Sequence, residues 1–232
     1  MFDLRHSHQT PIQRAASGLV RAHELAPPLA GRVCELVGST ERYAPAAVLA
    51  AAAPGTGLKW IVSGWACEAR VLGDGRRQIF SFAVPGDVVR PANSHQLRTL
   101  FAITAVECVD VVETLARASE REKVDILAAM NRAFFQNAER RYEHISRLGR
   151  RSALHRTAHL LMELHDRLDQ VGMVDGEAFA LPLTQEDMAD ALGLSVVHVN
   201  RSLRTLRESG LATLRYGRVT QFERDRLQEI CV

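Results

Sequence analysis

Residues 195–218 concentrate side chains that can hydrogen-bond to nucleic acid. This segment holds five arginines and one glutamate, so its local charge is +4, whereas the whole chain of 232 residues has a formal net charge of only +2. Placing its first half on a helical wheel at about 100° per residue separates two faces. The apolar face carries Val196, Val199, Leu203 and Leu206. The opposite face carries Val197, His198, Arg201, Arg204, Thr205 and Glu208, with Asn200 and Arg207 at its flanks.

The residues around this helix predict a helix–turn–helix. Thr184, followed three residues later by Asp187, is typical of a helix start in which a side chain and the backbone cap each other. Gly193 stands where a tight turn between two helices needs a positive φ. Ser195 can cap the second helix, and Gly210 can end it. An apolar inner face and a basic outer face indicate a helix that enters the major groove of DNA. The alternative is a helical hairpin whose charged face is simply solvated.

The side chains of the outer face suggest separate roles in binding DNA. Arg201 is central on this face, and its planar guanidinium matches the O6 and N7 acceptors of guanine. His198 or Asn200 could add a hydrogen bond to a base edge or a phosphate. Val197 could contact a thymine methyl group, although an isolated surface valine is also normal. The residues expected to contact phosphate, and so to position the helix, are Thr184, Ser195 and Arg204.

A short hairpin is predicted directly after the second helix. Residues 212–222 read as two strands around Gly217, which marks the turn, with Arg215 and Arg218 on either side of it. A hairpin in this place is a wing. We expect its two arginines to reach backbone phosphate or the minor groove.

Residues 119–148 contain no glycine or proline and predict one long helix. About 30 residues of helix run roughly 45 Å, which is longer than a small domain needs. Such a helix either spans two domains or pairs with a copy of itself, and an ordinary core helix is the alternative. The residues expected to form a dimer interface are Val124, Leu127, Met130, Phe134 and Ala138.

Residues 48–112 carry strand and turn signals. The segment 60–72 is extended in character, Gly73-Asp74-Gly75 forms a hairpin turn, and 78–84 is the returning strand. A further strand is expected at 103–112, mostly helix at 11–40, and a loop at 170–180. Short strands at this spacing predict a sandwich or jelly roll. Together with the helices predicted before and after it, this makes the expected fold class α+β.

Composition and spacing exclude several classes of protein. No run of about 18 apolar residues exists, so no membrane span is expected. The polar N-terminus lacks the apolar stretch of a secretion signal. No CxxC pair occurs, and His155 and His159, although spaced four residues apart as on a two-histidine metal face, lack an accompanying glutamate and make no site by themselves. We therefore expect a protein of the reducing cytoplasm without a metal site. No nucleophile–base arrangement and no phosphate- or dinucleotide-binding loop is present, so we expect no enzyme activity. The four cysteines are Cys34, Cys67, Cys108 and Cys231.

These motifs together resemble the CRP/FNR family of bacterial transcription regulators over roughly residues 40–225. The matching motifs are VSGWA at 62–66, GDGRRQI at 73–79, PGD at 85–87, LGRRSA at 148–153 and, most specifically, the helix–turn–helix at 183–211. The resemblance implies a cyclic-nucleotide-binding-type β-roll as sensor domain at 1–115, a dimerisation helix at 116–148 and a winged helix–turn–helix domain at 149–232. It further implies a homodimer that binds a palindromic operator in double-stranded DNA, with half-sites about 34 Å apart, and that works with RNA polymerase.

The stretch after Pro85-Gly86-Asp87 departs from the relatives that bind cyclic AMP. Those carry Gly-Glu and Arg-Ser or Arg-Thr in a phosphate-binding cassette, whereas residues 88–100 here hold only Arg98-Thr99 as an echo, with Arg90 as a further cation. Arg90, Arg98 and Thr99 are therefore the candidates for an effector pocket in this stretch. We expect no cofactor, and a sensor domain that binds either no small ligand or one other than cyclic AMP. The alternatives are a cyclic-nucleotide-responsive regulator in which Arg90 or Arg98 holds the phosphate, and an adaptor of the same fold that does not bind DNA.

Overall fold

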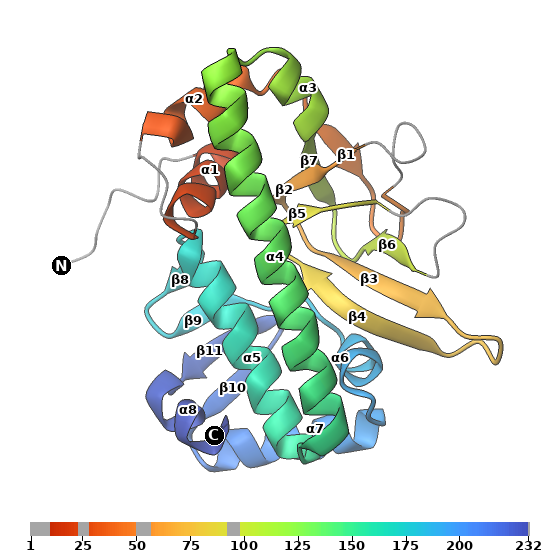
Figure 1. The fold of residues 1–232 in the computed structure, drawn as a ribbon. Helices are drawn as coiled ribbons and strands as arrows, with labels where there is room; N and C mark the ends of the chain where they lie inside the picture. The colour runs from red at the N-terminus through yellow and green to blue at the C-terminus, as the bar shows by residue number, and fades with distance from the viewer. Residues whose placement is uncertain (1–9, 23–27, 50–56, 92–97, 232) are drawn as a thin grey trace. The chain divides into compact units, whose positions relative to one another are not determined.

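A computed structural model describes residues 10–22, 28–49, 57–91 and 98–231 (Figure 1). The chain divides into two compact units. The first consists of Met1–Glu68, Phe82–Glu139 and Gln170–Gly172. The second consists of Ala69–Ser81, Arg140–Asp169 and Met173–Val232.

The first unit begins with two helices and a four-stranded sheet. The helices are α1 (Pro11–Ala22) and α2 (Pro28–Leu36), which confirms the prediction of mostly helix at 11–40. The strands pair antiparallel in the order β1-β7-β2-β5. Their bounds are Glu41–Tyr43 for β1, Val106–Asp110 for β7, Lys59–Ser63 for β2 and Val88–Val89 for β5.

A second sheet has the order β4-β3-β6, and it shares an apolar core with the first. Its strands are β3 (Ala66–Val71), β4 (Arg77–Ala83) and β6 (Thr99–Ala102), so the hairpin predicted around Gly73-Asp74-Gly75 is confirmed. Ile61 and Cys108 from the first sheet are buried in one cluster with side chains from the second. Two sheets with their inner faces packed together form the jelly-roll-like arrangement that the strand spacing predicts.

Gly64 divides the extended segment predicted at 60–72 into β2 and β3. Its φ is +81°, and a Cβ atom at this position would lie 1.9 Å from the carbonyl oxygen of Ala105. A side chain is therefore excluded by backbone conformation and by space, and the chain turns here instead of running on.

The strand predicted at 103–112 starts later and ends earlier than expected. β7 ends at Asp110, whose side chain accepts hydrogen bonds from the backbone N–H groups of Val112 and Glu113. This N-cap begins α3 (Val111–Ala116) directly at the end of the strand.

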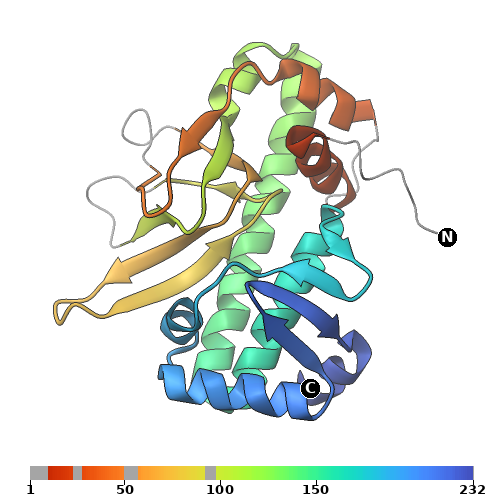
Figure 2. The same ribbon diagram turned by 180° about the vertical axis from the view of Figure 1, so that it is seen from behind.

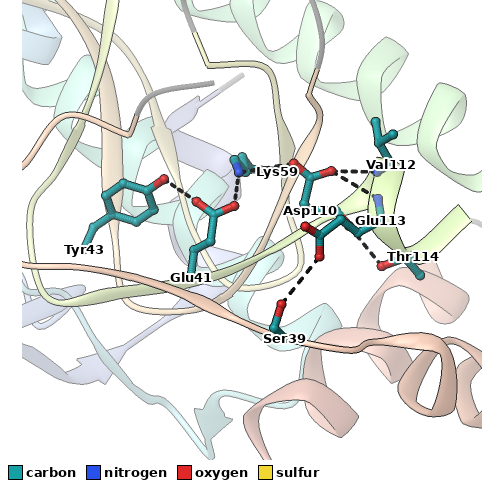
Figure 3. A network of polar contacts seen from close by, with 8 residues as sticks. All are labelled: Ser39, Glu41, Tyr43, Lys59, Asp110, Val112, Glu113 and Thr114. Carbon is teal, nitrogen blue, oxygen red and sulfur yellow. Dashed lines mark hydrogen bonds and ion pairs between the residues drawn. The ribbon is translucent and has the colours of Figure 1, made fainter. Parts of the chain in front are cut away.

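A buried lysine connects three parts of the first sheet (Figure 3). Lys59 is completely buried, and its ammonium group pairs with Glu41 and with Asp110, whose carboxylate oxygen lies 3.3 Å away. The Tyr43 hydroxyl donates to the second oxygen of Glu41 at 2.5 Å. Burial lowers the pKa of Lys59, but the hydrogen bonds to its two carboxylate partners more than offset this, so the pKa is raised and the lysine stays charged.

One helix of 31 residues, α4 (Glu120–Arg150), confirms the long helix predicted at 119–148. The first turn carries Glu120 and Glu122 and the last turn carries Arg147 and Arg150. This charge order complements the helix dipole at both ends. Leu148 is followed by Gly149, yet the helix continues to Arg150.

The second unit is built around a sheet with the order β10-β11-β9-β8. The loop expected at 170–180 instead contains a small hairpin, β8 (Val174–Asp175) and β9 (Ala178–Ala180), and the sequence did not predict the last helix, α8 (Arg224–Cys231). The core includes His165 of α5 (Ala153–Gln170), whose ring stacks on Phe222 with 4.6 Å between centroids. The remaining elements are α6 (Gln185–Leu192), α7 (Val196–Glu208), β10 (Ala212–Arg215) and β11 (Arg218–Phe222), seen from behind in Figure 2.

The observed elements confirm the predicted α+β fold with an N-terminal β-roll, a long helix and a C-terminal winged helix–turn–helix. The domain bounds at 1–115, 116–148 and 149–232 stay a prediction. Among the described helices, none combines the length and the apolar composition needed to cross a membrane.

Candidate nucleic-acid interface

The start of α6 has the reciprocal cap that the sequence predicts. The Thr184 hydroxyl accepts from the backbone N–H of Asp187 at 3.0 Å, and the Asp187 carboxylate accepts from the backbone N–H of Thr184 at 2.9 Å. The helix ends at Gly193, which has φ +60° and ψ +39°, the left-handed conformation that a tight turn requires. These local contacts fix the angle at which α7 leaves the turn.

The packed face of α7 agrees with the helical wheel except at its first turn. Val199 and Leu206 are fully buried, and Leu203 is half-buried. The helical wheel places Val196 on this face, yet it is 39% exposed, because it lies at the open first turn. Ser202 is buried in its place, and its hydroxyl donates to the carbonyl oxygen of His198 at 2.9 Å.

The residues predicted to read bases are all exposed on α7. Val197 is 65% exposed, and Asn200 and Arg201 lie on the same solvent-facing side. The Ser195 hydroxyl caps the helix by accepting from the backbone N–H of His198, and it lies 2.9 Å from Nδ1 of the same histidine. This contact fixes the imidazole at the N-terminal end of α7, where a recognition helix first meets the bases.

Arg204 is paired on the helix surface. Its Nε donates to Glu208 at 2.7 Å, with both side chains more than half exposed. The hydrogen bond raises the pKa of Arg204 and lowers the pKa of Glu208. An exposed pair of this kind contributes little to stability, so a phosphate can replace the glutamate at small cost.

A cleft of about 510 Å³ brings together phosphate candidates from three elements. It lies between α7 and the wing formed by β10 and β11. The residues that line it include Thr184, Asn200, Arg204, Arg207, Arg215 and Tyr216. Ser195 and Arg218, the other two phosphate candidates, lie outside this cleft. Three arginines without an acidic residue in the lining make the cleft suited to an anionic backbone.

Tyr216 at the tip of the wing is a further candidate, which the sequence pattern alone does not single out. It is completely exposed, and its φ of +50° is a left-handed conformation that is rare for a bulky side chain. Gly217 follows with φ +70°, so both central residues of the turn have positive φ. An aromatic residue directly before the turn glycine, with Arg215 and Arg218 beside it, was the available signal.

Comparison with known proteins identifies the family. A family model described as a Crp-like helix-turn-helix domain matches residues 155–230. The nitrogen fixation regulation protein FixK of Rhizobium meliloti (strain 1021) is 30% identical over 165 residues, which are 70% of this chain and 72% of that protein. The chain belongs to the CRP/FNR family of transcription regulators.

Further similarities extend over most of the chain. FixK of Azorhizobium caulinodans is 30% identical over 155 residues, so the match spans 66% of this chain but only 62% of that relative. The solved structure of FixK2 from Bradyrhizobium japonicum superposes with a TM-score of 0.68 at 25% identity, covering 84% of this chain and 98% of that one. A CRP/FNR family regulator from Thermus thermophilus, at 17% identity and a TM-score of 0.60 over 83% of this chain and 98% of its own, shares the fold.

The three effector-pocket candidates of this CRP/FNR chain already have separate surroundings. Arg98 forms an ion pair with Glu68, a β3 residue that is 3% exposed. The Arg90 guanidinium lies over the ring of Phe134 at 5.7 Å from its centroid. Thr99 is the first residue of β6. Arg90 and Arg98 therefore engage different elements of the first unit.

The predicted dimer residues divide between the two sides of α4. Val124, Leu127 and Phe134 are exposed, and Ala138 is half-buried. Met130 is 3% exposed and packs into the core of the first unit. Three further apolar side chains of α4 outside the predicted set are exposed: Phe135, Tyr142 and Ile145.

Proposed function

We propose that this chain is a sequence-specific DNA-binding regulator that acts as a homodimer. The observation that carries the proposal is the exposed face of α7, where Arg201 is central, together with the three-arginine cleft between α7 and the wing. Among the described residues, the Arg201 guanidinium has no hydrogen-bond or ion-pair partner in the protein. A cation left unpaired on an exposed face is available for a base or a phosphate.

In the proposed complex α7 enters the major groove and its side chains read the bases. Arg201 donates two N–H groups from one edge of its guanidinium to O6 and N7 of a guanine, which a lysine could not do with the same geometry. His198 and Asn200 are the further hydrogen-bonding candidates, and Val197 is the candidate for a thymine methyl group. Most of the base discrimination is assigned to Arg201.

The proposed phosphate contacts surround this helix. Thr184 and Ser195 cap the two helices and present hydroxyl groups beside helix N-termini, where backbone N–H groups and the helix dipole favour an anion. Arg204, Arg215 and Arg218 supply positive charge from α7 and the wing, and Arg207 joins them as a residue that lines the cleft. These contacts position the helix, and they make binding salt-dependent.

The proposed dimer forms along α4. Apolar positions on one side of this helix follow spacings of three, four or seven residues: the exposed Val124, Leu127, Phe134, Tyr142 and Ile145 and the half-buried Ala138, with the exposed Phe135 beside them. A stripe at this spacing on a 31-residue helix suits pairing with a second copy of the same helix. Two-fold symmetry then places two copies of α7 on a palindromic operator, in half-sites about 34 Å apart.

We further propose that the sensor domain does not depend on cyclic AMP. Arg98 is the residue whose sequence position best suits a cyclic phosphate, and the negative charge of Glu68 already compensates it. A phosphate would have to displace this carboxylate. RNA polymerase is proposed as the protein partner and the cytoplasm as the compartment.

Selection of DNA from a random duplex pool tests the proposal. The purified protein is incubated without ligand and with cyclic AMP, and the bound DNA is sequenced. We expect a palindromic site in both conditions, recovered from a complex of two chains per duplex. A site recovered only with cyclic AMP would contradict the proposal for the sensor domain. No enrichment in either condition would contradict DNA binding by this chain alone and favour the adaptor.

A further inference from the structure

The hairpin β3–β4 contacts the first helix of the helix–turn–helix through one arginine. Arg77, the first residue of β4, pairs with two acids of α6 at once. Its Nη2 lies 2.6 Å from Oδ1 of Asp187, and its Nε lies 2.7 Å from Oδ2 of Asp190. The next residue, Gln78, donates from its amide to the carbonyl oxygen of Asp190 at 2.8 Å. Three hydrogen bonds from two adjacent residues thus attach the hairpin to one face of α6.

We propose that Arg77 is a positioning residue for DNA binding, which holds α6 and neutralises its two carboxylates so that the helix–turn–helix can approach a phosphate backbone. The proposal rests on the DNA-binding function proposed above. Arg77 itself makes no contact with DNA in this scheme.

The Asp187 carboxylate connects Arg77 to the N-terminal end of α6, which is the end proposed to face DNA. Its Oδ2 atom accepts the N–H and the hydroxyl of Thr184 and so closes the helix cap. Its Oδ1 atom accepts from Arg77. The same carboxylate therefore joins the hairpin to Thr184, a residue proposed to contact phosphate. Loss of Arg77 removes one of the two anchors of the group that orients this cap.

The ion pairs of Arg77 also reduce the negative charge that α6 presents to DNA. Asp187 and Asp190 are negative groups on a helix that must come close to a polyanion. The Arg77 guanidinium hydrogen-bonds both carboxylates. Arg77, Asp187 and Asp190 together therefore carry one net negative charge, whereas the two carboxylates alone would carry two. Burial lowers the pKa of Arg77, but its hydrogen bonds to Asp190 and Asp187 more than offset this, so the pKa is raised and the cation persists. Without it, two unpaired carboxylates would repel the DNA backbone.

The contact lines an open cleft and is partly exposed to solvent. The cleft has a volume of about 1010 Å³ and is also lined by Glu186 and Ser195. The Arg77 side chain keeps 32% of its surface exposed. Residues 77–83 form one strand, which continues from the second unit into Phe82 and Ala83 of the first. The strand that carries Arg77 is therefore shared by both units.

The test compares the affinity of Arg77→Ala and of the unmodified protein for the selected operator. We expect Arg77→Ala to bind about tenfold more weakly, the size that two charged hydrogen bonds support. The matched control is Arg76→Ala, because Arg76 pairs with Asp74 of the same turn and is 80% exposed. The control should bind with unchanged affinity. Arg77→Lys keeps the positive charge but lacks the planar guanidinium that bonds both carboxylates. Its affinity for the operator should therefore fall between those of Arg77→Ala and the control.

A double-mutant cycle separates this role from general destabilisation. Asp190→Asn should restore part of the affinity in the Arg77→Ala background, because it removes one unpaired carboxylate, and should improve binding less in the unmodified background, where Arg77 already compensates that carboxylate. Affinities are measured well below the thermal midpoint of every variant. Unchanged or tighter binding by Arg77→Ala would overturn the proposal, and so would a loss that Asp190→Asn does not relieve. If the unmodified protein selects no operator, the proposed function fails instead.

Discussion

Cations are used in opposite ways in the two units of this molecule. In the first unit Lys59 is completely buried between Glu41 and Asp110, and one of these acids also caps α3. In the second unit Arg201 lies on the exposed face of α7 without an acidic partner among the described residues. The first cation is satisfied by the fold itself. The guanidinium of Arg201 remains available to a binding partner, which is the arrangement that a binding surface requires.

The comparison separates stability from binding, and it predicts that substitutions in the two regions affect different measurements. A buried cation whose partners remain behind should change the free energy of unfolding. An exposed cation should change the affinity for DNA while leaving the fold intact.

The largest expected effect is that of Lys59→Ala on stability. Removing the ammonium group leaves the largely buried Asp110 carboxylate without its cation, which costs about 3–5 kcal/mol. Urea unfolding followed by circular dichroism measures this change. The matched control is Lys123→Ala, the other lysine of the chain, whose pair with Glu120 lies at the surface and should contribute less than about 1 kcal/mol. Equal losses in the two variants would contradict the comparison.

Arg201→Ala should leave unfolding unchanged and weaken operator binding. A bidentate contact to guanine contributes about 1–3 kcal/mol per half-site, and base preference at the contacted position should relax. Fluorescence anisotropy with the selected operator and with a duplex altered at that position measures both effects. The matched control is Arg226→Ala on α8, because Arg226 is also exposed but lies outside the interface, and it should bind as the unmodified protein does. A variant of Arg201 with unchanged base selection would refute the assignment.

Tyr216→Asn should have opposite effects on the two measurements. Asparagine tolerates a positive φ better than tyrosine does, so the substitution relieves about 1 kcal/mol of backbone strain and raises the thermal midpoint. It also removes an exposed aromatic ring from the wing tip, so affinity for DNA should fall. A rise in stability with unchanged affinity would mean that the wing tip does not contact DNA.

The smallest expected effect is on the pH dependence of stability, at a half-buried histidine whose pKa is lowered in the folded state. Burial lowers the pKa of His144 below its usual 6.5, and the nearby Arg147 lowers it further, whereas Glu163 and a hydrogen bond with the Ile79 backbone oppose this. Because the unfolded chain then binds more protons, the stability from this histidine is present above about pH 6.5 and is lost as the pH falls below it. Unfolding of His144→Gln between pH 8 and 5 should be less pH-dependent than that of the unmodified protein. An unchanged slope would show that other groups dominate.

Much of the helix–turn–helix could be predicted because its signals are local. Thr184 and Asp187 cap one helix within a single turn, Gly193 supplies the one left-handed residue, and Ser195 begins the next helix. The long helix α4 and the hairpin around residues 73–75 follow from equally local patterns. In each case the residues that interact lie within a few positions of one another.

The tertiary structure alone decided where the longer-range partners are. Periodicity places Met130 and Phe134 on one stripe, but only packing within the first unit decides that Met130 lies inside while Phe134 stays exposed. Arg98 meets Glu68 across 30 positions, and Arg77 meets Asp187 across 110. No local pattern encodes such pairs, because the strand register and the turns between the elements bring them together. The sequence by itself therefore determined which residues could bind DNA, and the tertiary structure decided which charges remain available for it.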